Sequence, residues 1–151
     1  MTPTRYLKVV AYVTRRSPGG RTELLVFDHR DHPEAGTQVP AGTVHDGESI
    51  DHALHREVLE ETGRADLRTV RMLAHYEWIH PRTGNIHERH VFHLEAPPEV
   101  PDEWAWTETS GGEVSDEHGY VFVYRWVPLD HVPPLAGGLG DHLDTLRTSL
   151  T

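Results

Sequence analysis

Three glutamates lie within five residues of one another in the stretch REVLEETG, residues 56–63. If this stretch is helical, Glu57, Glu60 and Glu61 share one side, because positions three and four residues apart are neighbours on a helix. Carboxylates at this spacing repel one another, and the C-terminal end of a helix disfavours anions. A divalent cation would offset both effects, and a ligand set made only of oxygens suits Mg²⁺ or Mn²⁺. The alternative that these residues leave open is a solvated acidic helix end without a ligand.

The helix that would carry these carboxylates is predicted over Ile50–Thr62. Ser49 is a suitable N-terminal cap, and Gly63 stands where a left-handed residue commonly ends a helix. At about 3.6 residues per turn, the apolar positions between Ile50 and Val58 form one arc, which overlaps the arc of the three glutamates. A solvated acidic face would lie opposite the core instead, so the overlap favours a ligand-binding role for the glutamates.

Two β-hairpins are predicted on either side of this helix in the sequence. The first joins Tyr6–Thr14 to Glu23–His29 through the turn sequence SPGG, and the second joins Thr69–His80 to Ile86–Glu95 through PRTGN. Tyr120–Val127 is predicted as a further strand. Strands in hairpins with few helices predict an α/β protein in which helices cover a mixed sheet.

The last third of the chain is predicted to be less regular. Proline, glycine and acidic residues interrupt Ala96–Gly119, which is expected to be a loop. Leucines at helical spacing between Leu139 and Leu150 predict a C-terminal helix that packs on the sheet. No repeat and no linker divides the 151 residues, so a single domain over residues 1–151 is expected.

Composition disfavours several classes of function. The formal net charge of −10 argues against a nucleic-acid-binding protein, which would carry a basic face. The chain has no cysteine, hence no disulfide and no thiolate metal site, and its 13 histidines form no closed zinc-ligand pattern. No apolar run approaches the roughly 20 residues that span a bilayer, and the N-terminal stretch lacks the features of a signal peptide. A cytoplasmic protein without a membrane or nucleic-acid partner is therefore expected.

Residues upstream of the glutamates extend the pattern into a longer motif. Gly42, Glu48, Arg56 and Gly63 stand with the glutamates at the spacing G-x5-E-x7-R-E-U-x-E-E-x-G, where U is aliphatic. This motif resembles the Nudix box, the signature of hydrolases that cut a nucleoside diphosphate linked to another moiety. The final position of the box is usually aliphatic and is Arg64 here. The resemblance implies the Nudix-like fold, an α/β/α sandwich around a mixed β-sheet.

Two further segments resemble the same family. VPAGTVHDGES, residues 39–49, is similar to the loop that enters the box helix, and WVPLDHV, residues 126–132, is similar to the family's last strand. The resemblance therefore covers most of the chain, although only the box is highly specific.

The resemblance also implies roles for individual residues. The implied metal ligands are the carboxylates of Glu57, Glu60 and Glu61 and the backbone carbonyl of Ala41. Arg56 resembles the arginine that orients the first of these glutamates, with a surface pairing along the helix as the alternative. Glu48 is expected to brace the junction between loop and helix, and Gly42 and Gly63 are expected to have structural roles.

The implied reaction is the attack of water on one phosphorus of a pyrophosphate, with Mg²⁺ or Mn²⁺ polarising the phosphoryl oxygens. Proteins with this box use either the first glutamate of the cluster, here Glu57, or a carboxylate from a later loop as the base. The loop candidates are Glu103, Glu108, Glu113, Asp116 and Glu117. Among them Glu113 and Glu117 are favoured, because the flanking glycines permit a mobile loop.

The substrate is expected to be a small nucleotide of the ADP-ribose, nucleotide-sugar or dinucleoside polyphosphate type. Arg30, Tyr76 and Trp78 are the predicted substrate contacts, an arginine for phosphate and aromatic rings for a base. Trp104 and Trp106 are further aromatic candidates, with a place in the core or at its rim as the alternative. A homodimer is one assembly that the sequence leaves open. Two other functions stay open, a non-catalytic nucleotide sensor and an acidic protein-interaction domain.

Overall fold

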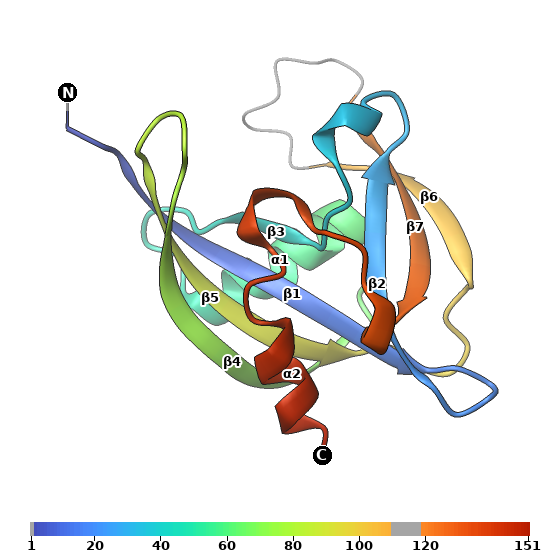
Figure 1. Cartoon of the computed structure of the whole chain (residues 1–151). Helices are drawn as coiled ribbons and strands as arrows, with labels where there is room; N and C mark the ends of the chain where they lie inside the picture. Colours follow the sequence, from blue (N-terminus) through green and yellow to red (C-terminus); the bar gives the residue numbers. More distant parts are fainter. Residues whose placement is uncertain (1, 110–118) are drawn as a thin grey trace.

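A mixed seven-stranded sheet forms the centre of the protein (Figure 1). The computed structural model describes residues 2–109 and 119–151. Its strands are β1 Arg5–Arg16, β2 Thr22–His29, β3 Ala41–Thr43, β4 Arg68–Ile79, β5 Ile86–Glu95, β6 Glu103–Thr107 and β7 Val121–Pro128. Its helices are α1 Ile50–Thr62 and α2 Leu143–Ser149, with the short 3₁₀ turns η1 Pro33–Ala35, η2 Leu129–His131 and η3 Ala136–Gly138. None of these helices is long and apolar enough to cross a membrane.

The strands are arranged in the order β4-β5-β1-β2-β7-β6, and β3 pairs with β1 beside this path. Both predicted hairpins are present, because β1 pairs antiparallel with β2 and β4 pairs antiparallel with β5. β1 also runs parallel to β5, from Arg5 beside Ile86 to Thr14 beside Glu95. The prediction of a mixed sheet is therefore confirmed, and β1 is its central strand.

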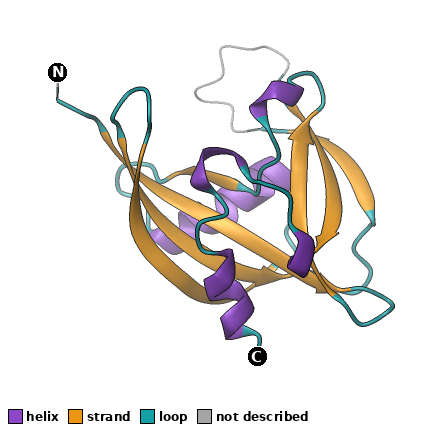
Figure 2. Cartoon of the chain, viewed as in Figure 1, coloured by secondary structure: helices purple, strands orange, loops and turns teal. Residues whose placement is uncertain are grey.

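Helices cover both faces of the sheet, α1 on one face and α2 on the other (Figure 2). Alternation along β1 divides its side chains between these faces. Val9, Ala11 and Val13 pack in the core beneath α1, whereas Val10 and Tyr12 pack in the core beneath α2. This is the α/β/α sandwich that the sequence predicts.

The prediction that Ala96–Gly119 is a loop is wrong for Glu103–Thr107, which form β6. β6 pairs antiparallel with β7, with Trp104 opposite Tyr124. The segment is short and its alternate residues are exposed, so its own sequence carries a weak strand signal. Pairing with a strand that comes later in the chain stabilises it instead, as tertiary context commonly does for strands.

The C-terminal helix is shorter than the leucine spacing predicts. α2 begins only at Leu143, because His142 directly before it has φ −115° and ψ 19°, outside the helical conformation. Leu139 lies outside the helix and still packs in the core beneath α2. Leu150 follows the helix and is exposed.

Candidate active site

The carboxylates are carried by α1, whose two ends are set by the residues expected from the sequence. The Ser49 hydroxyl caps the N-terminus by accepting a hydrogen bond of 3.1 Å from the His52 amide. Gly63 ends the helix at a φ of 76°, and its amide donates to the Leu59 carbonyl at 2.9 Å. The prediction of a helix over Ile50–Thr62 is therefore confirmed.

Glu57 lies against β3, where Gly42 leaves room for it. A Cβ atom at position 42 would overlap the Glu57 carboxylate, so glycine is needed for this approach. The Glu57 side chain is only 8% exposed, and burial raises its pKa. Gly42 thus sets how closely β3 and α1 approach at the carboxylates.

The guanidinium of Arg56 connects the carboxylates to the loop that precedes the helix. Its Nη1 donates to Glu57 at 2.9 Å and to Glu60 at 3.0 Å. Its Nε and Nη2 donate to the two Glu48 oxygens at 2.7 and 2.9 Å, and Nη2 also donates to the Thr43 carbonyl at 2.9 Å. The Arg56 side chain is 17% exposed, so this is an enclosed network and not a surface pair. Its hydrogen bonds orient Glu57 and hold the pKa of Glu48 well below its usual range.

Glu61 lies next to the backbone of β3. Its Oε1 accepts a hydrogen bond of 3.1 Å from the Ala41 amide. Burial, and then the charge of Glu57, raise the pKa of Glu61 well above its usual value. A nearby cation favours the ionised form of such carboxylates. The structure thus brings the glutamates of α1 together with Ala41, whose carbonyl as a metal ligand stays a prediction.

The negative end of α1 is stabilised by aromatic side chains from β6 and β7. Each donates to a backbone carbonyl of the last turn: Trp106 to Glu60 at 2.9 Å, Trp104 to Thr62 at 3.0 Å and Tyr124 to Glu61 at 2.7 Å. Trp106 also packs on Gly63, where a Cβ atom would lie 2.5 Å from the indole ring. These bonds satisfy carbonyls that the helix itself leaves without partners. Trp104 and Trp106 therefore support the helix, in agreement with the core-or-rim alternative.

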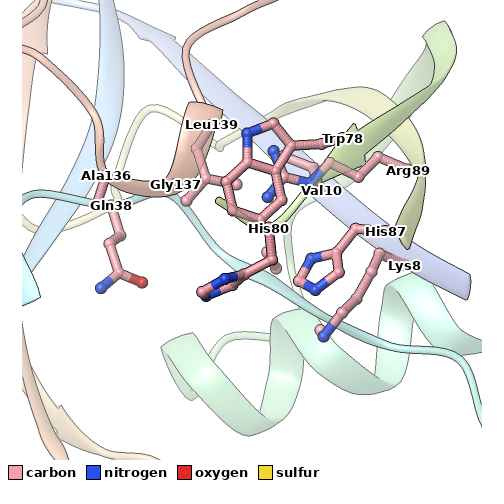
Figure 3. A pocket seen from close by; sticks show the side chains of 12 residues that line it. Lys8, Val10, Gln38, Trp78, His80, His87, Arg89, Ala136, Gly137 and Leu139 are labelled. Atoms are coloured by element: carbon pink, nitrogen blue, oxygen red, sulfur yellow. The ribbon is translucent and has the colours of Figure 1, made fainter. Parts of the chain in front are cut away.

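A cavity of about 290 Å³ (Figure 3) opens beside β3, the strand that Glu57 and Glu61 contact. Ala41 and Gly42 of β3 form one wall, and η3 forms another. Side chains from β1, from β5 and from the end of β4 with the residue that follows it line much of the rest: Lys8, Trp78, His80, His87 and Arg89. Segments that are distant in the sequence thus build one cavity next to the candidate metal ligands.

The cavity wall formed by β1 and β5 is electropositive. The buried Arg89 guanidinium lies 4.4 Å from the centre of the Trp78 ring and donates to the Tyr76 hydroxyl at 3.1 Å. Lys8 supplies a second cation. Burial, and then the charges of Lys8 and Arg89, lower the pKa of His87 to about 4, so its ring is neutral near pH 7. This wall therefore favours an anionic group such as a phosphate.

The predicted substrate contacts lie in different surroundings. Trp78 lines the cavity. Tyr76 is not a lining residue, but its hydroxyl holds the Arg89 guanidinium. Arg30 is exposed, is paired with the neighbouring aspartate at 3.0 Å, and is not among the residues that line the cavity. The structure does not bring Arg30 to this site and presents Arg89 there instead.

Lys8, His87 and Arg89 are not among the site residues that the sequence predicts. One signal was available for two of them, because His87 and Arg89 stand two residues apart on a predicted strand and must share a face. Their meeting with Lys8 depends on the parallel pairing of β1 with β5, which places Lys8 beside Arg89. No local sequence pattern predicts the pairing of β1 with β5.

The candidates for a base in the later loop are only partly described. Outside the described residues lie Glu113, Asp116 and Glu117. Glu103 is exposed on β6. Glu108 is buried and lies close enough to Glu61 to raise the pKa of that residue. Glu108 therefore interacts with the carboxylates of α1, whereas the roles of Glu113 and Glu117 stay predictions.

The family of the chain follows from comparison with known proteins. The profile of the NUDIX domain matches residues 5–146. The chain therefore belongs to the Nudix family, and the resemblance of its box is confirmed.

Individual relatives agree with this assignment. The chain is 30% identical over 116 residues to the NAD-capped RNA hydrolase NudC of Pasteurella multocida, an alignment that covers 74% of this chain and 37% of that protein. It thus spans little more than a third of that relative's length. The NUDIX domain of Shewanella oneidensis NrtR, solved as a complex with ADP ribose, matches with a TM-score of 0.69 at 17% identity, covering 99% of this chain and 91% of that one. The MutT NUDIX hydrolase of Burkholderia pseudomallei matches with a TM-score of 0.66 at 22% identity, covering 95% and 98%.

Proposed function

We propose that the chain is a Nudix hydrolase, one domain over residues 1–151, that cleaves the pyrophosphate bond of a nucleoside diphosphate linked to another moiety. The observation that carries this proposal is the position of the α1 carboxylates, which meet β3 at the wall of a cavity that also carries Lys8 and Arg89. Acidic and basic groups side by side suit a substrate whose phosphates contact metal ions on one side and cationic side chains on the other.

The donor atoms beside the cavity fit Mg²⁺ or Mn²⁺. The residues that would hold the ion are Glu57, Glu60, Glu61 and Ala41 through its carbonyl, a set made only of oxygens. A bound cation would favour the ionised form of Glu57 and Glu61, whose pKa values burial raises. When bound, the ion polarises the phosphoryl oxygens and offsets the negative charge that develops on them.

The side chains of the protein position the groups and accept the proton. Arg56 keeps Glu57 and Glu60 in place through its hydrogen bonds of 2.9 and 3.0 Å. Lys8 and Arg89 hold an anionic part of the substrate in the cavity. The oxygen of water attacks one phosphorus, the bond from that phosphorus to the bridging oxygen breaks, and a carboxylate takes the proton of the water. The candidates for this carboxylate are Glu57, Glu108, Glu113 and Glu117.

Two relatives support the substrate class. The NrtR domain is complexed with ADP ribose, and NudC is named for NAD-capped RNA. Both ligands contain a nucleoside diphosphate joined through its pyrophosphate to another group. We therefore propose a small-molecule nucleotide of the ADP-ribose, nucleotide-sugar or dinucleoside polyphosphate type as the substrate.

The test is a hydrolysis assay on one representative of each of these types and on nucleoside triphosphates. Release of nucleoside monophosphate with Mg²⁺ or Mn²⁺, and none with EDTA, is the expected result. A folded sample that binds ADP ribose but turns over no member of the set with either metal would support the non-catalytic sensor instead.

A further inference from the structure

Three metal-ligating side chains meet away from the cavity, on the β4–β5 hairpin: His75, Glu88 and His90. His75 lies directly opposite His90 in the register of the two strands, and Glu88 stands two residues before His90 on β5. Both relations place side chains on one face of a sheet. His87 and Arg89, which alternate with them along β5, point into the cavity on the other face.

We propose that His75, Glu88 and His90 form a second metal site, which binds Zn²⁺. One ligand atom from each of the three lies within 4.8 Å of the other two. Two imidazoles and a carboxylate are a ligand set that zinc takes in proteins, with a fourth position left for water. The carboxylates of α1 offer oxygens only and suit Mg²⁺ or Mn²⁺, so the two sites differ in the metal that they select.

The side chains need a small rearrangement to hold the ion. The rings of His75 and His90 stack with their centres 4.1 Å apart and their planes 18° apart, whereas a metal lies in the plane of each imidazole that binds it. One ring must therefore turn, and the His75 side chain, at 51% exposed, has the space to do so. Ligand atoms of a tetrahedral zinc ion lie about 3.3 Å apart, so the three atoms close in by at most about 1.5 Å.

His90 has a ring nitrogen, Nδ1, that is buried and has no hydrogen-bond partner among the described residues. A buried polar atom of this kind ordinarily has a partner, and a metal ion is one that an imidazole nitrogen accepts.

The existing partners of Glu88 leave it available to a metal. One of its oxygens, Oε2, lies 3.0 Å from His75 Nε2, and the other accepts a long hydrogen bond of 3.3 Å from Arg5. Arg5 has a closer partner in Glu77, at 2.5 Å. Zinc at Glu88 would therefore leave the Arg5 guanidinium with an ion pair.

Calorimetric titration with Zn²⁺, in excess Mg²⁺, tests the proposal. We expect one Zn²⁺ per wild-type chain and an affinity at least about tenfold weaker in His75→Gln and in Glu88→Gln, because even the loss of an outer contact at a metal site weakens binding by about 10–100-fold. The matched control is His131→Gln, which alters an exposed histidine of η2 and should leave the affinity unchanged. Circular dichroism of each variant confirms that it is folded.

A second variant separates this site from the carboxylates of α1. Glu61→Gln should keep its affinity for Zn²⁺, and a loss there would place the ion at α1 and overturn the proposal. Equal affinity in wild type, His75→Gln and Glu88→Gln would overturn it as well. These titrations measure Zn²⁺ binding and not turnover. A result that overturns the zinc site would therefore not contradict the proposed hydrolase activity, and an absence of hydrolysis would not contradict the zinc site.

Discussion

The carboxylates of α1 and the cavity beside them are built in different ways. The carboxylates come from little more than one turn of one helix, and their convergence follows from the spacing of Glu57, Glu60 and Glu61. The cavity takes its lining from β1, β3, β4, β5 and η3, which only the folded chain brings together. A carboxylate cluster on one helix can therefore be predicted from a sequence, whereas a cavity lined by several strands cannot.

The largest expected effect on activity comes from Glu57→Gln, which removes one carboxylate of α1 and does not alter the residues that line the cavity. The variant keeps the size of the side chain but loses a negative charge and the capacity to act as a base. We expect kcat to fall by about 10²–10⁴-fold, with KM changed much less. Steady-state kinetics with saturating Mg²⁺ measures both constants. A near wild-type kcat would contradict the catalytic assignment of Glu57.

Glu108→Gln, Glu113→Gln and Glu117→Gln locate the base. If one of them matches the loss in Glu57→Gln while Mg²⁺ affinity is retained, the base is in the later loop and Glu57 is chiefly a ligand. If all three leave kcat within a few-fold of wild type, Glu57 is the base.

The reverse experiment is Arg89→Gln, which removes a cation from the cavity wall and leaves the carboxylates of α1 unchanged. A hydrogen bond to a charged group contributes about 1.5–3 kcal/mol, so we expect KM to rise by about ten- to a hundredfold with a smaller change in kcat. Arg30→Gln alters an exposed arginine outside the cavity and should have the smaller effect. A larger KM effect at Arg30 would show that the substrate extends to the end of β2 and that the sequence prediction was right.

Glu61→Gln tests, through the melting temperature, whether the carboxylates of α1 bind Mg²⁺. Mg²⁺ should raise the melting temperature of the wild-type protein, because it binds the folded state, and most of that rise should disappear in the variant. Without metal the variant should be slightly more stable than wild type near pH 7, because it lacks a carboxyl group whose ionised form the folded protein disfavours. Melting curves with Mg²⁺ and with EDTA give both quantities. A metal-free variant that is less stable, with its Mg²⁺ effect unchanged, would make Glu61 a structural partner.

The stabilities of the wild-type protein and of Glu61→Gln should depend differently on pH. The pKa of Glu61 is higher in the folded state than its ordinary value of 4.5, so above that pH the folded state binds more protons than the unfolded state. Stability of the metal-free wild type from this group therefore falls as pH rises above about 4.5, and Glu61→Gln lacks that fall. Histidines with lowered pKa values act in the opposite direction, but they are common to both proteins and cancel in the difference.

The smallest expected effect is that of Trp106→Phe, which removes the indole hydrogen bond to the Glu60 carbonyl and keeps a ring on Gly63. One such bond contributes about 1 kcal/mol, or about 2–4 °C in melting temperature for a chain of this size. The matched control is Trp126→Phe, whose indole donates to the Pro101 carbonyl at 3.0 Å, away from α1. Both variants should lose similar stability, but only Trp106→Phe should weaken Mg²⁺ binding. Equal Mg²⁺ affinity in the two would mean that the helix end holds without Trp106.

Local physics explains which parts of the fold the sequence predicts. The limits of α1 follow from Ser49 and Gly63, which act on the backbone within one turn. Hairpins with short turns are predicted for the same reason. The strand β6 is not, because its pairing with β7 stabilises a segment whose own pattern is weak.

The same limit applies to charged and polar sites. Arg89 is buried between Trp78 and Tyr76, but no sequence pattern distinguishes it from the other arginines of the chain. The histidines show no zinc-ligand spacing in the sequence, because His75 and His90 become neighbours only through the register of two paired strands. The sequence therefore predicts ligands that lie on one turn of a helix and misses ligands that different strands contribute.

The capping of α1 by β6 and β7 has a consequence for the order in which the site is made. During translation the whole box, Gly42–Arg64, leaves the ribosome before the side chains that hold the last turn of its helix, Trp104, Trp106 and Tyr124. A nascent chain that ends before β6 carries the motif but lacks all three donors to the terminal carbonyls of the helix. The signature of the family is thus synthesised early and becomes a fixed arrangement of carboxylates only when the last strands have docked.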